Sequence, residues 1–496
     1  MNQLADASLA APPASRTLFG QPRGLATLFF TEMWERFTYY GMRGVLILYM
    51  VAATSAGGLG LDDRTASAIY GMYIGGTYLF GLLGGWIADR LLGAQRAIAS
   101  GAVLIIVGNL MLTLGNTPLF FLGLLVITIG VGLLKPNASV LVASLYPEGG
   151  SRRDAGFSVF YMGINLGAFI GPLLVGWFAE RVGWHWGFAL PALGTTVGLA
   201  QFLLTRRYLG QAGLAPAAAA ARGWRPIALL GAALAGIFVL ALTGVLRIDA
   251  VWLGAAVSWA MVLLGVGYFA YLLLLAGLNA IERNRVVVMI ALVAASALFW
   301  AGYEQTGASM NLFAERYTDR HILGWNMPTA WLQSVNPLFI IAFAPVFAAV
   351  WIALGKRGRD LNAAGKFGAG LILLGLGFLV MYFAAQHVVA GELVGPSWLI
   401  LAYLLHTFGE LSLSPVGLSY MSKLAPPRFV GQVMGMWFLS MALGSNLAGQ
   451  LSGQYDQSHL ESLPALFLKI FWYGVIGGAV MLALTPFVRR LMAGVR

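Results

Sequence analysis

Long, unbroken apolar runs fill most of this 496-residue chain and constrain its fold more than any other feature. A helix that spans a bilayer needs about 20 mostly apolar residues, whereas an outer-membrane barrel shows short alternating segments. The sequence predicts an all-α membrane protein with fourteen transmembrane helices, at 24–51, 66–88, 96–115, 118–145, 156–179, 186–205, 225–246, 250–276, 286–314, 328–354, 367–386, 397–421, 430–453 and 466–488.

Composition agrees with this fold class and excludes others. Hydrophobic residues make up 59% of the chain and charged residues 10%, whereas soluble domains are about half apolar and about a quarter charged. Mean hydropathy is +0.79, which excludes a cytosolic enzyme, a disordered chain and a coiled coil. The chain has no cysteine, so a disulfide framework and a thiolate metal site or nucleophile are excluded as well.

The distribution of basic residues predicts the orientation of the chain. With the N-terminus inside, the cytoplasmic segments hold 21 of the 30 Lys and Arg residues and the outer segments hold six, when residues at the ends of the runs are counted with the loops; the other three, Arg36, Arg43 and Lys135, lie well inside the apolar runs. By the positive-inside rule, both termini are expected on the cytoplasmic side of the membrane. This asymmetry also explains the net charge of +11 without a nucleic-acid partner.

The seventh and eighth runs differ from the others. They follow an Ala-rich linker at 211–222 and the seventh is almost free of polar residues, whereas neighbouring runs hold charges and many glycines. We therefore expect a six-helix bundle at 1–208, a linker and inserted hairpin at 209–284, and a second six-helix bundle at 285–496. Two six-helix bundles around a midplane site form the major facilitator fold.

Ionisable residues inside the apolar runs predict a functional site. Each costs about 2.5–3.5 kcal/mol at a bilayer centre, or on the order of 20 kcal/mol for the set. Static ion pairs between helices are the alternative, but intramembrane charges are functional by default. They must face one another or a wet cavity. The seven residues are Glu32, Glu35, Arg36, Arg43, Lys135, Glu304 and Glu410.

The first and fourth runs supply cations for this site. Residues from Glu32 to Arg43 recur at spacings of three and four, so Glu32, Glu35, Arg36, Tyr39, Tyr40 and Arg43 form one polar helix face. Lys135 precedes Pro136, where we expect the helix to break and to free backbone carbonyls.

The second half of the chain supplies carboxylates and amides. Glu410 precedes Pro415, where we expect another break, and Asn336 precedes Pro337. If the two halves face each other, a cationic wall lies opposite an anionic one. That polarity suits a zwitterion with separated ends, such as a dipeptide or tripeptide of roughly 7–10 Å at about 3.3–3.6 Å per residue.

Several motifs resemble one known family. Residues 32–41, Glu-Met-Trp-Glu-Arg-Phe-Thr-Tyr-Tyr-Gly, resemble the E-x-x-E-R-F-x-Y-Y-G motif of the proton-dependent oligopeptide transporters. Residues 157–172 resemble that family's fifth-helix signature, and residues 299–305 and 409–415 resemble its seventh- and tenth-helix patterns. Residues 85–90 resemble the loop motif of the wider major facilitator superfamily.

The resemblance implies a role for each candidate residue. It implies that Arg36 and Lys135 hold the peptide carboxylate, and that Glu32, Glu35 and Glu304 couple protons to transport. Arg43 and Glu304 would pair across an outer gate. The amino end of the peptide would contact Asn165, Asn336 and Glu410, and the side-chain pockets would be lined by Tyr39, Tyr40, Tyr78, Trp300 and Trp437.

The sequence thus predicts a proton-coupled symporter that imports di- and tripeptides by alternating access. We expect it to act as a monomer in the bilayer, with small peptides and protons as partners, no cofactor and no metal. A carrier of the same fold for nitrate, a peptide-like drug or an exported metabolite is the alternative. An enzyme is disfavoured because the chain has no H-E-x-x-H motif and no Ser/His/Asp set at membrane depth.

Overall fold

The computed structural model describes residues 17–18, 20–147, 150–215, 224–243, 245–246, 249–322, 324–357, 361–455 and 459–492, so part of the predicted linker at 211–222 lies outside them. Two short antiparallel strand pairs join Thr17–Leu18 (β1) to Gln21–Pro22 (β2) and His321–Ile322 (β3) to Trp325–Asn326 (β4). The α-helices are α1 (Arg23–Val51), α2 (Asp63–Ile87), α3 (Ala94–Thr113), α4 (Thr117–Ser144), α5 (Gly150–Arg181), α6 (Trp184–Thr205), α7 (Arg225–Leu242), α8 (Ala250–Leu274), α9 (Ala280–Tyr303), α10 (Ser309–Arg316), α11 (Val335–Lys356), α12 (Ala363–Val389), α13 (Ser397–Leu424), α14 (Val430–Ser452), α15 (Ser462–Ala483) and α16 (Thr485–Leu491).

Short helical turns connect several of these helices. They are the 3-10 helices η1 (Thr54–Ala56), η3 (Arg206–Leu209), η5 (Glu304–Gly307), η6 (Thr329–Ser334) and η7 (Pro427–Phe429), and the π-helical turn η2 (Ala88–Leu92).

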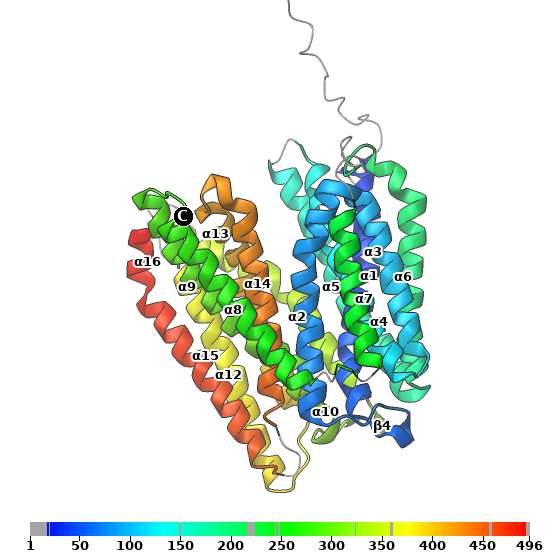
Figure 1. Ribbon diagram of the computed structural model, residues 1–496. Helices are drawn as coiled ribbons and strands as arrows, with labels where there is room; N and C mark the ends of the chain where they lie inside the picture. Colours follow the sequence, from blue (N-terminus) through cyan, green and yellow to red (C-terminus); the bar gives the residue numbers. More distant parts are fainter. Residues whose placement is uncertain are drawn as a thin grey trace, which may run out of the picture.

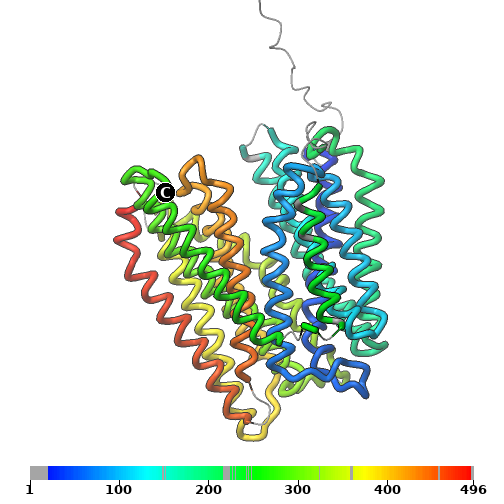
Figure 2. The backbone as a smooth tube through the Cα atoms, viewed as in Figure 1, coloured from blue at the N-terminus to red at the C-terminus, as the bar shows by residue number. Residues whose placement is uncertain are grey.

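The helices form two groups that lie side by side (Figure 1). In the first group, α1 packs against α5 and α6, and α3 packs against α4 and α6. In the second, α12 packs against α13 and α15, and α14 packs against α9. Figure 2 follows the chain from the blue first group to the red second group, with the green helices α7 and α8 between them in sequence. Helix α8 packs against both α2 and α14, so it contacts both groups.

The all-α prediction is confirmed, since each predicted apolar run corresponds to a helix. Among the described residues, eleven helical stretches are long and apolar enough to cross a membrane. Helix α1 is not one of these eleven, and it carries the charged residues Arg23, Glu32, Glu35, Arg36 and Arg43. The number of fourteen spans therefore stays a prediction.

The predicted breaks at Pro136 and Pro415 are wrong, because α4 and α13 continue through these prolines. Each proline removes the N–H donor for the carbonyl four residues earlier, that of Gly132 or Leu411, and the helix continues with this one bond missing. Side-chain donors add bonds to neighbouring carbonyls. Asn137 Nδ2 donates to the Leu133 carbonyl at 2.7 Å, and the Ser412 hydroxyl donates to the Phe408 carbonyl at 2.8 Å. The helix instead ends at Tyr303, within the predicted run 286–314, where η5 and α10 follow α9.

The two groups meet closely through small residues of α2 and α14. A methyl group added at Gly71 would lie 2.9 Å from the Gly449 Cα atom. The Ser67 and Ser452 hydroxyls are 3.1 Å apart in the same contact. Small side chains let helix backbones approach one another, and this approach occurs where α2 begins and α14 ends.

A second contact joins α5 to η6 at the same end of the molecule. The Ser334 hydroxyl donates to the Phe169 carbonyl at 2.7 Å, and Trp331 Nε1 donates to the Leu173 carbonyl at 2.8 Å. Figure 1 shows the two groups approaching each other at this lower end, near α10 and β4. The molecule is therefore held together across its two groups mainly at one end.

Candidate functional site

The polar face of α1 forms a buried cluster of opposite charges. Arg36 Nε lies 3.1 Å from Glu32 Oε1, one helical turn earlier, and the guanidinium also pairs with the Glu35 carboxylate. The three side chains are almost fully buried. The cost of burying them is offset because each charge has a partner of opposite sign. The predicted spacing of four residues places Glu32 beside Arg36, whereas Glu35 pairs with Arg36 as its neighbour in the chain.

Lys135 of α4 lies against aromatic rings beside this cluster. Its Nζ atom is 4.4 Å from the centre of the Tyr78 ring and 5.7 Å from that of Tyr39. The Arg36 guanidinium lies 5.0 Å from the Tyr39 ring. Among the described residues, the ion pairs include no carboxylate bonded to Lys135. Lys135 is therefore a cation held by ring faces and available to an anionic group.

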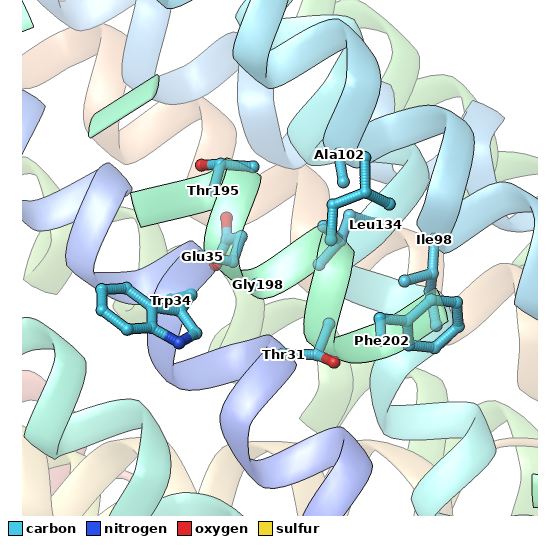
Figure 3. Close-up of a pocket in the computed structure, with 10 residues that line it drawn as sticks. Thr31, Trp34, Glu35, Ile98, Ala102, Leu134, Thr195, Gly198 and Phe202 are labelled. Carbon is cyan, nitrogen blue, oxygen red and sulfur yellow. The ribbon is translucent and has the colours of Figure 1, made fainter. Parts of the chain in front are cut away.

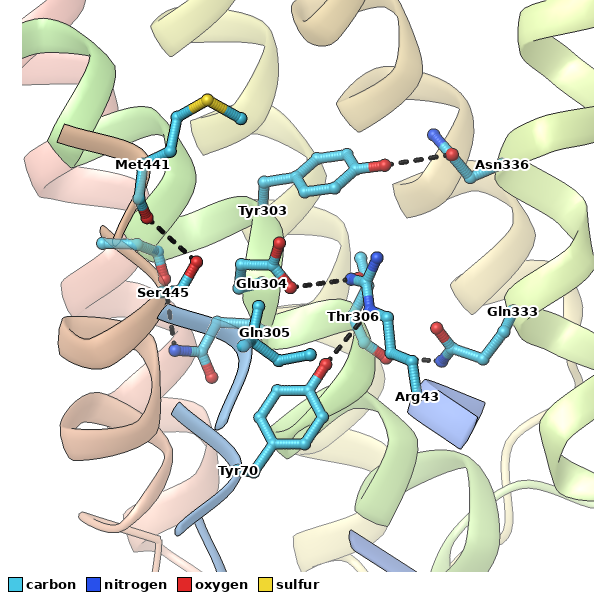
Figure 4. A network of polar contacts seen from close by, with 12 residues as sticks. Arg43, Tyr70, Tyr303, Glu304, Gln305, Thr306, Gln333, Asn336, Met441 and Ser445 are labelled. Atoms are coloured by element: carbon cyan, nitrogen blue, oxygen red, sulfur yellow. Dashed lines mark hydrogen bonds and ion pairs between the residues drawn. The ribbon is translucent and has the colours of Figure 1, made fainter. Parts of the chain in front are cut away.

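Arg43 connects the two helix groups two turns further along α1. Its Nη2 atom lies 3.1 Å from Glu304 Oε2, at the start of η5. Arg43 Nε donates to the Tyr70 hydroxyl at 3.0 Å, and its guanidinium also donates to the Thr306 hydroxyl. Figure 4 shows Arg43 between Tyr70 and Glu304. The end of α9 at Tyr303 places Glu304 and Thr306 where both can reach Arg43.

A second carboxylate site lies on α11 and α13. Asn336 Nδ2 donates to Glu410 Oε2 at 3.2 Å and to the Thr407 hydroxyl at 2.9 Å. The Tyr303 hydroxyl donates to Asn336 Oδ1 at 3.0 Å, as Figure 4 also shows. The ion pairs of the described residues include no cation bonded to Glu410. This carboxylate is therefore ordered by hydrogen bonds and available to a cationic group.

Tyr40 lies within electrostatic range of residues from both the cationic and the anionic wall. It is close enough to Arg36, Arg43 and Glu410 to interact electrostatically with all three. Its ring packs edge-on against that of Tyr39, with the centroids 5.3 Å apart. Lys135 likewise lies within electrostatic range of Glu304. The two walls that the sequence assigns to different halves of the chain therefore face a common region.

Three predicted site residues make contacts within their own helix group. Asn165 Nδ2 donates to the Tyr161 carbonyl of its own helix at 2.9 Å. Trp437 is buried against Phe367 and lies very close to Gly417. Trp300 packs edge-on against Tyr303, with the centroids 5.1 Å apart. Their predicted roles toward a peptide stay predictions.

The sequence reasoning missed Tyr303, Tyr70 and Thr306. Tyr303 lies between the gate and the second carboxylate, because its ring is 5.6 Å from Arg43 and its hydroxyl reaches Asn336. The sequence does contain an indication that Tyr303 belongs to the site, because it directly precedes Glu304 in the motif at residues 299–305. Tyr70 and Thr306 carry no charge, so a search for buried ionisable residues does not find them.

Known proteins resemble this chain in sequence. A model of the POT family, the proton-dependent oligopeptide transporters, matches residues 95–466. The chain belongs to the POT family. It is 43% identical over 495 residues to the peptide transporter YePEPT of Yersinia enterocolitica, with 97% of each protein covered. It is also 35% identical to a di-/tripeptide transporter of Lactococcus lactis subsp. cremoris, over 97% of this chain and 98% of that one.

Solved POT structures resemble the whole molecule. A crystal structure of a peptide transporter POT in complex with sulfate matches with a TM-score of 0.90 and 41% identity, over 97% of each chain. The comparisons confirm the family resemblance and the predicted all-α membrane transporter fold. This POT family member is a multi-pass membrane transporter and not an enzyme.

Proposed function

We propose that this POT family member is a proton-coupled symporter that imports di- and tripeptides across a bacterial inner membrane. One observation carries the proposal: Lys135, without a carboxylate partner among the described residues, and Glu410, ordered by Asn336, come from different helix groups and both lie within electrostatic range of Glu304. The peptide carboxylate would bind Lys135 and Arg36, and the peptide ammonium would bind Glu410. The names of the relatives, a peptide transporter and a di-/tripeptide transporter, support the same substrate class.

Protons are the proposed coupling ion. Glu304 and the Glu32–Glu35 pair are carboxylates buried inside the protein, and each lies beside a basic residue. When such a carboxylate binds a proton it loses its charge, so its hold on the basic partner weakens. Protonation of Glu304 from outside would thus release Arg43 and allow the two helix groups to separate there.

Alternating access would move one helix group against the other around the peptide. We place both termini in the cytoplasm, on the strength of the basic residues in the predicted inner loops. The end at which α2 and α14 are in contact would then be the outer side. In that orientation, this conformation is closed toward the outside. We further propose that one chain suffices, since both walls of the site come from it.

The test uses purified protein in liposomes that contain a pH-sensitive dye. An inside-negative potential is imposed and dialanine is added outside. We expect internal acidification that requires both peptide and potential, because each inward positive charge gains about 2.3 kcal/mol per 100 mV. Empty liposomes are the control. If dialanine binds but causes no acidification, proton coupling is wrong. If dialanine does not bind, the substrate class is wrong and another solute must be sought.

A further inference from the structure

The inserted helix α8 lies across the boundary between the two helix groups, since it packs against α2 of the first group and α14 of the second. It runs obliquely from the lower end of the molecule, where the groups meet, to the upper end of the second group (Figure 2). When two groups move against each other, one rigid helix cannot keep its contacts with both. The bonds that α8 makes therefore indicate which group it follows.

Two amide side chains of α14 bind the first half of α8. Asn446 Nδ2 donates to the Gly254 carbonyl at 2.7 Å and to the Ser258 hydroxyl at 2.8 Å. Gln450, one turn further along α14, donates to the same two oxygens at 3.2 Å and 2.8 Å. Asn446 and Ser258 are 1% and 6% exposed. Amide side chains hydrogen-bond across membrane helices, so these four bonds attach α8 to the second group.

The other end of α8 is attached to the same group. Arg428, in η7 just before α14, donates through Nη2 to the Ala276 carbonyl at 2.7 Å and to the Gly277 carbonyl at 3.1 Å, shortly after α8 ends. A cation near a helix C-terminus stabilises the last carbonyls. The Tyr271 and Phe429 rings also pack edge-on, with their centroids 6.3 Å apart. Residues of the second group thus bind α8 along its whole length.

The contact between α8 and α2 is weaker. A methyl group added at Gly254 would lie 3.8 Å from Met72 Cγ, so the two helices touch there through apolar atoms. Among the described residues, no hydrogen bond or ion pair joins α8 to α2. An open hollow of about 890 Å³ lies among α2, α8 and α14, with Ala68 and Val251 in its walls. Within the first group, by contrast, the space between α1, α3, α4 and α6 in Figure 3 has a volume of only about 10 Å³.

We propose that Asn446 and Gln450 fix α8 to the second group, and that α8 moves with this group while α2 slides along it during transport. The proposal rests on the alternating access proposed above. Opening of the outer side separates α2 from α14, so α2 must also move away from a helix that is bonded to α14. The contact between Met72 and Gly254 would then break, while the four amide bonds remain.

The start of the insertion is bound to the first group instead. Gln95 Nε2, at the beginning of α3, donates to the Ala212 carbonyl at 2.7 Å and to the Gly210 carbonyl at 3.2 Å. The chain therefore enters the insertion on the first group and leaves it on the second. The segment between Ala212 and α8, which includes α7, must accommodate the movement of one group against the other.

Cross-linking tests which contact moves, because the chain has no cysteine of its own. In Met72→Cys/Gly254→Cys, a short bifunctional methanethiosulfonate joins α8 to α2, and we expect it to abolish uptake of dialanine until a reductant removes the link. The matched pair is Gly265→Cys/Leu439→Cys, since a methyl group at Gly265 would lie 4.0 Å from Leu439 Cδ2 of α14. Its link joins α8 to α14 and should leave uptake unchanged. Uptake that survives the first link, or is lost with the second, would overturn the proposal.

A second measurement does not depend on transport. Spin labels at Trp252→Cys on α8 and Leu460→Cys near the start of α15 report the distance between α8 and the second group, and both positions are exposed. Asn446→Leu combined with Gln450→Leu removes the four hydrogen bonds from α14. We expect a broader distribution of label distances in this variant than in the parent protein.

Gln454→Leu is the matched control for the amide variant, because the described hydrogen bond of Gln454 is with Lys469 and not with α8. A distribution that stays narrow without Asn446 and Gln450 would show that these amides do not hold α8. If the parent protein itself does not take up dialanine, the proposed function is wrong. The label distances still test the attachment of α8 in that case, so the two failures can be told apart.

Discussion

Arg43 Nη2 and Glu304 Oε2 lie 3.1 Å apart and join α1 to the residue that follows α9, one from each helix group. The two side chains are 4% and 2% exposed. Removing one partner of such a buried pair leaves an uncompensated charge and costs about 3–5 kcal/mol. The closed arrangement of the two groups therefore depends on the charge of Glu304, and a proton on Glu304 is expected to weaken it.

Glu304→Gln is predicted to abolish proton-driven accumulation of dialanine while leaving peptide exchange across the membrane. The amide keeps the shape of the side chain but cannot lose a proton, so the coupling step is removed and binding is retained. Uptake driven by a potential and counterflow exchange are measured in the same liposomes. Glu315→Gln is the matched control, because Glu315 is 42% exposed on the nearby α10. Accumulation by Glu304→Gln would exclude Glu304 as an essential proton site.

The sequence predicted the charged residues of this gate but not its geometry. Seven ionisable residues in apolar runs indicate a site because a bilayer penalises each of them. The cost of burying a charge in the bilayer does not indicate at which residue a helix ends. The end of α9 at Tyr303, which places Glu304 and Thr306 beside Arg43, has no proline beside it. Gly302 and Gly307 flank it, but glycines such as Gly41 also lie inside continuous helices, so they do not by themselves mark the end. The prolines that do predict a helix end, Pro136 and Pro415, lie inside continuous helices.

Lys135→Gln is predicted to weaken binding of dialanine by roughly 10- to 150-fold, which is the loss of affinity expected when one hydrogen bond to a charged group is removed. Lys135 has no carboxylate partner among the described residues, so its removal should leave no protein carboxylate newly unpaired. Dialanine amide has no C-terminal carboxylate. It should therefore bind the Lys135→Gln variant and the parent protein with similar affinity.

Lys423→Gln removes an exposed lysine of α13 and serves as the control. Binding is measured by calorimetry for both peptides and all three proteins. Equal losses for dialanine and its amide would show that Lys135 does not bind the carboxylate.

Glu410→Gln is predicted to lower the affinity for dialanine by roughly 10-fold or more, since it removes the charge that faces the peptide ammonium. In the wild-type protein, Asn336 Nδ2 donates to Glu410 Oε2 at 3.2 Å. Glutamine keeps a side-chain carbonyl that can accept this hydrogen bond, so the surrounding structure should be retained. N-acetyl-dialanine has no ammonium and is the matched ligand. If the variant weakens both ligands alike, Glu410 does not recognise the amino end.

The prediction of a cationic wall opposite an anionic wall assumed that the two halves of the chain face each other. Sequence patterns do not test this assumption. Tyr40 lies within electrostatic range of both Arg36 and Glu410, which are 374 positions apart in the chain. Helical spacing groups residues on one helix face, so it predicted the Glu32–Arg36 cluster. Contacts between helices distant in sequence, such as Tyr303 with Asn336, depend on packing that a single sequence does not encode in any local pattern.

The close approach of α2 to α14 leads to the last prediction. A side chain at Gly71 would overlap Gly449 and the Ser445 carbonyl, each 2.9 Å from the added Cβ atom. Gly71→Val should therefore keep the two groups apart at this end and slow transport strongly. Gly81→Val is the control, because a Cβ atom at Gly81 on the same helix meets no atom within 4 Å.

The separation can be measured with spin labels, because the chain has no cysteine of its own. Ser55→Cys and Leu460→Cys place labels on exposed residues near the beginning of α2 and of α15. We expect a longer distance between the labels in Gly71→Val than in Gly81→Val or the parent protein, since helices that cannot touch cannot complete the closed state. An unchanged distance with normal uptake would show that the α2–α14 contact is passive packing.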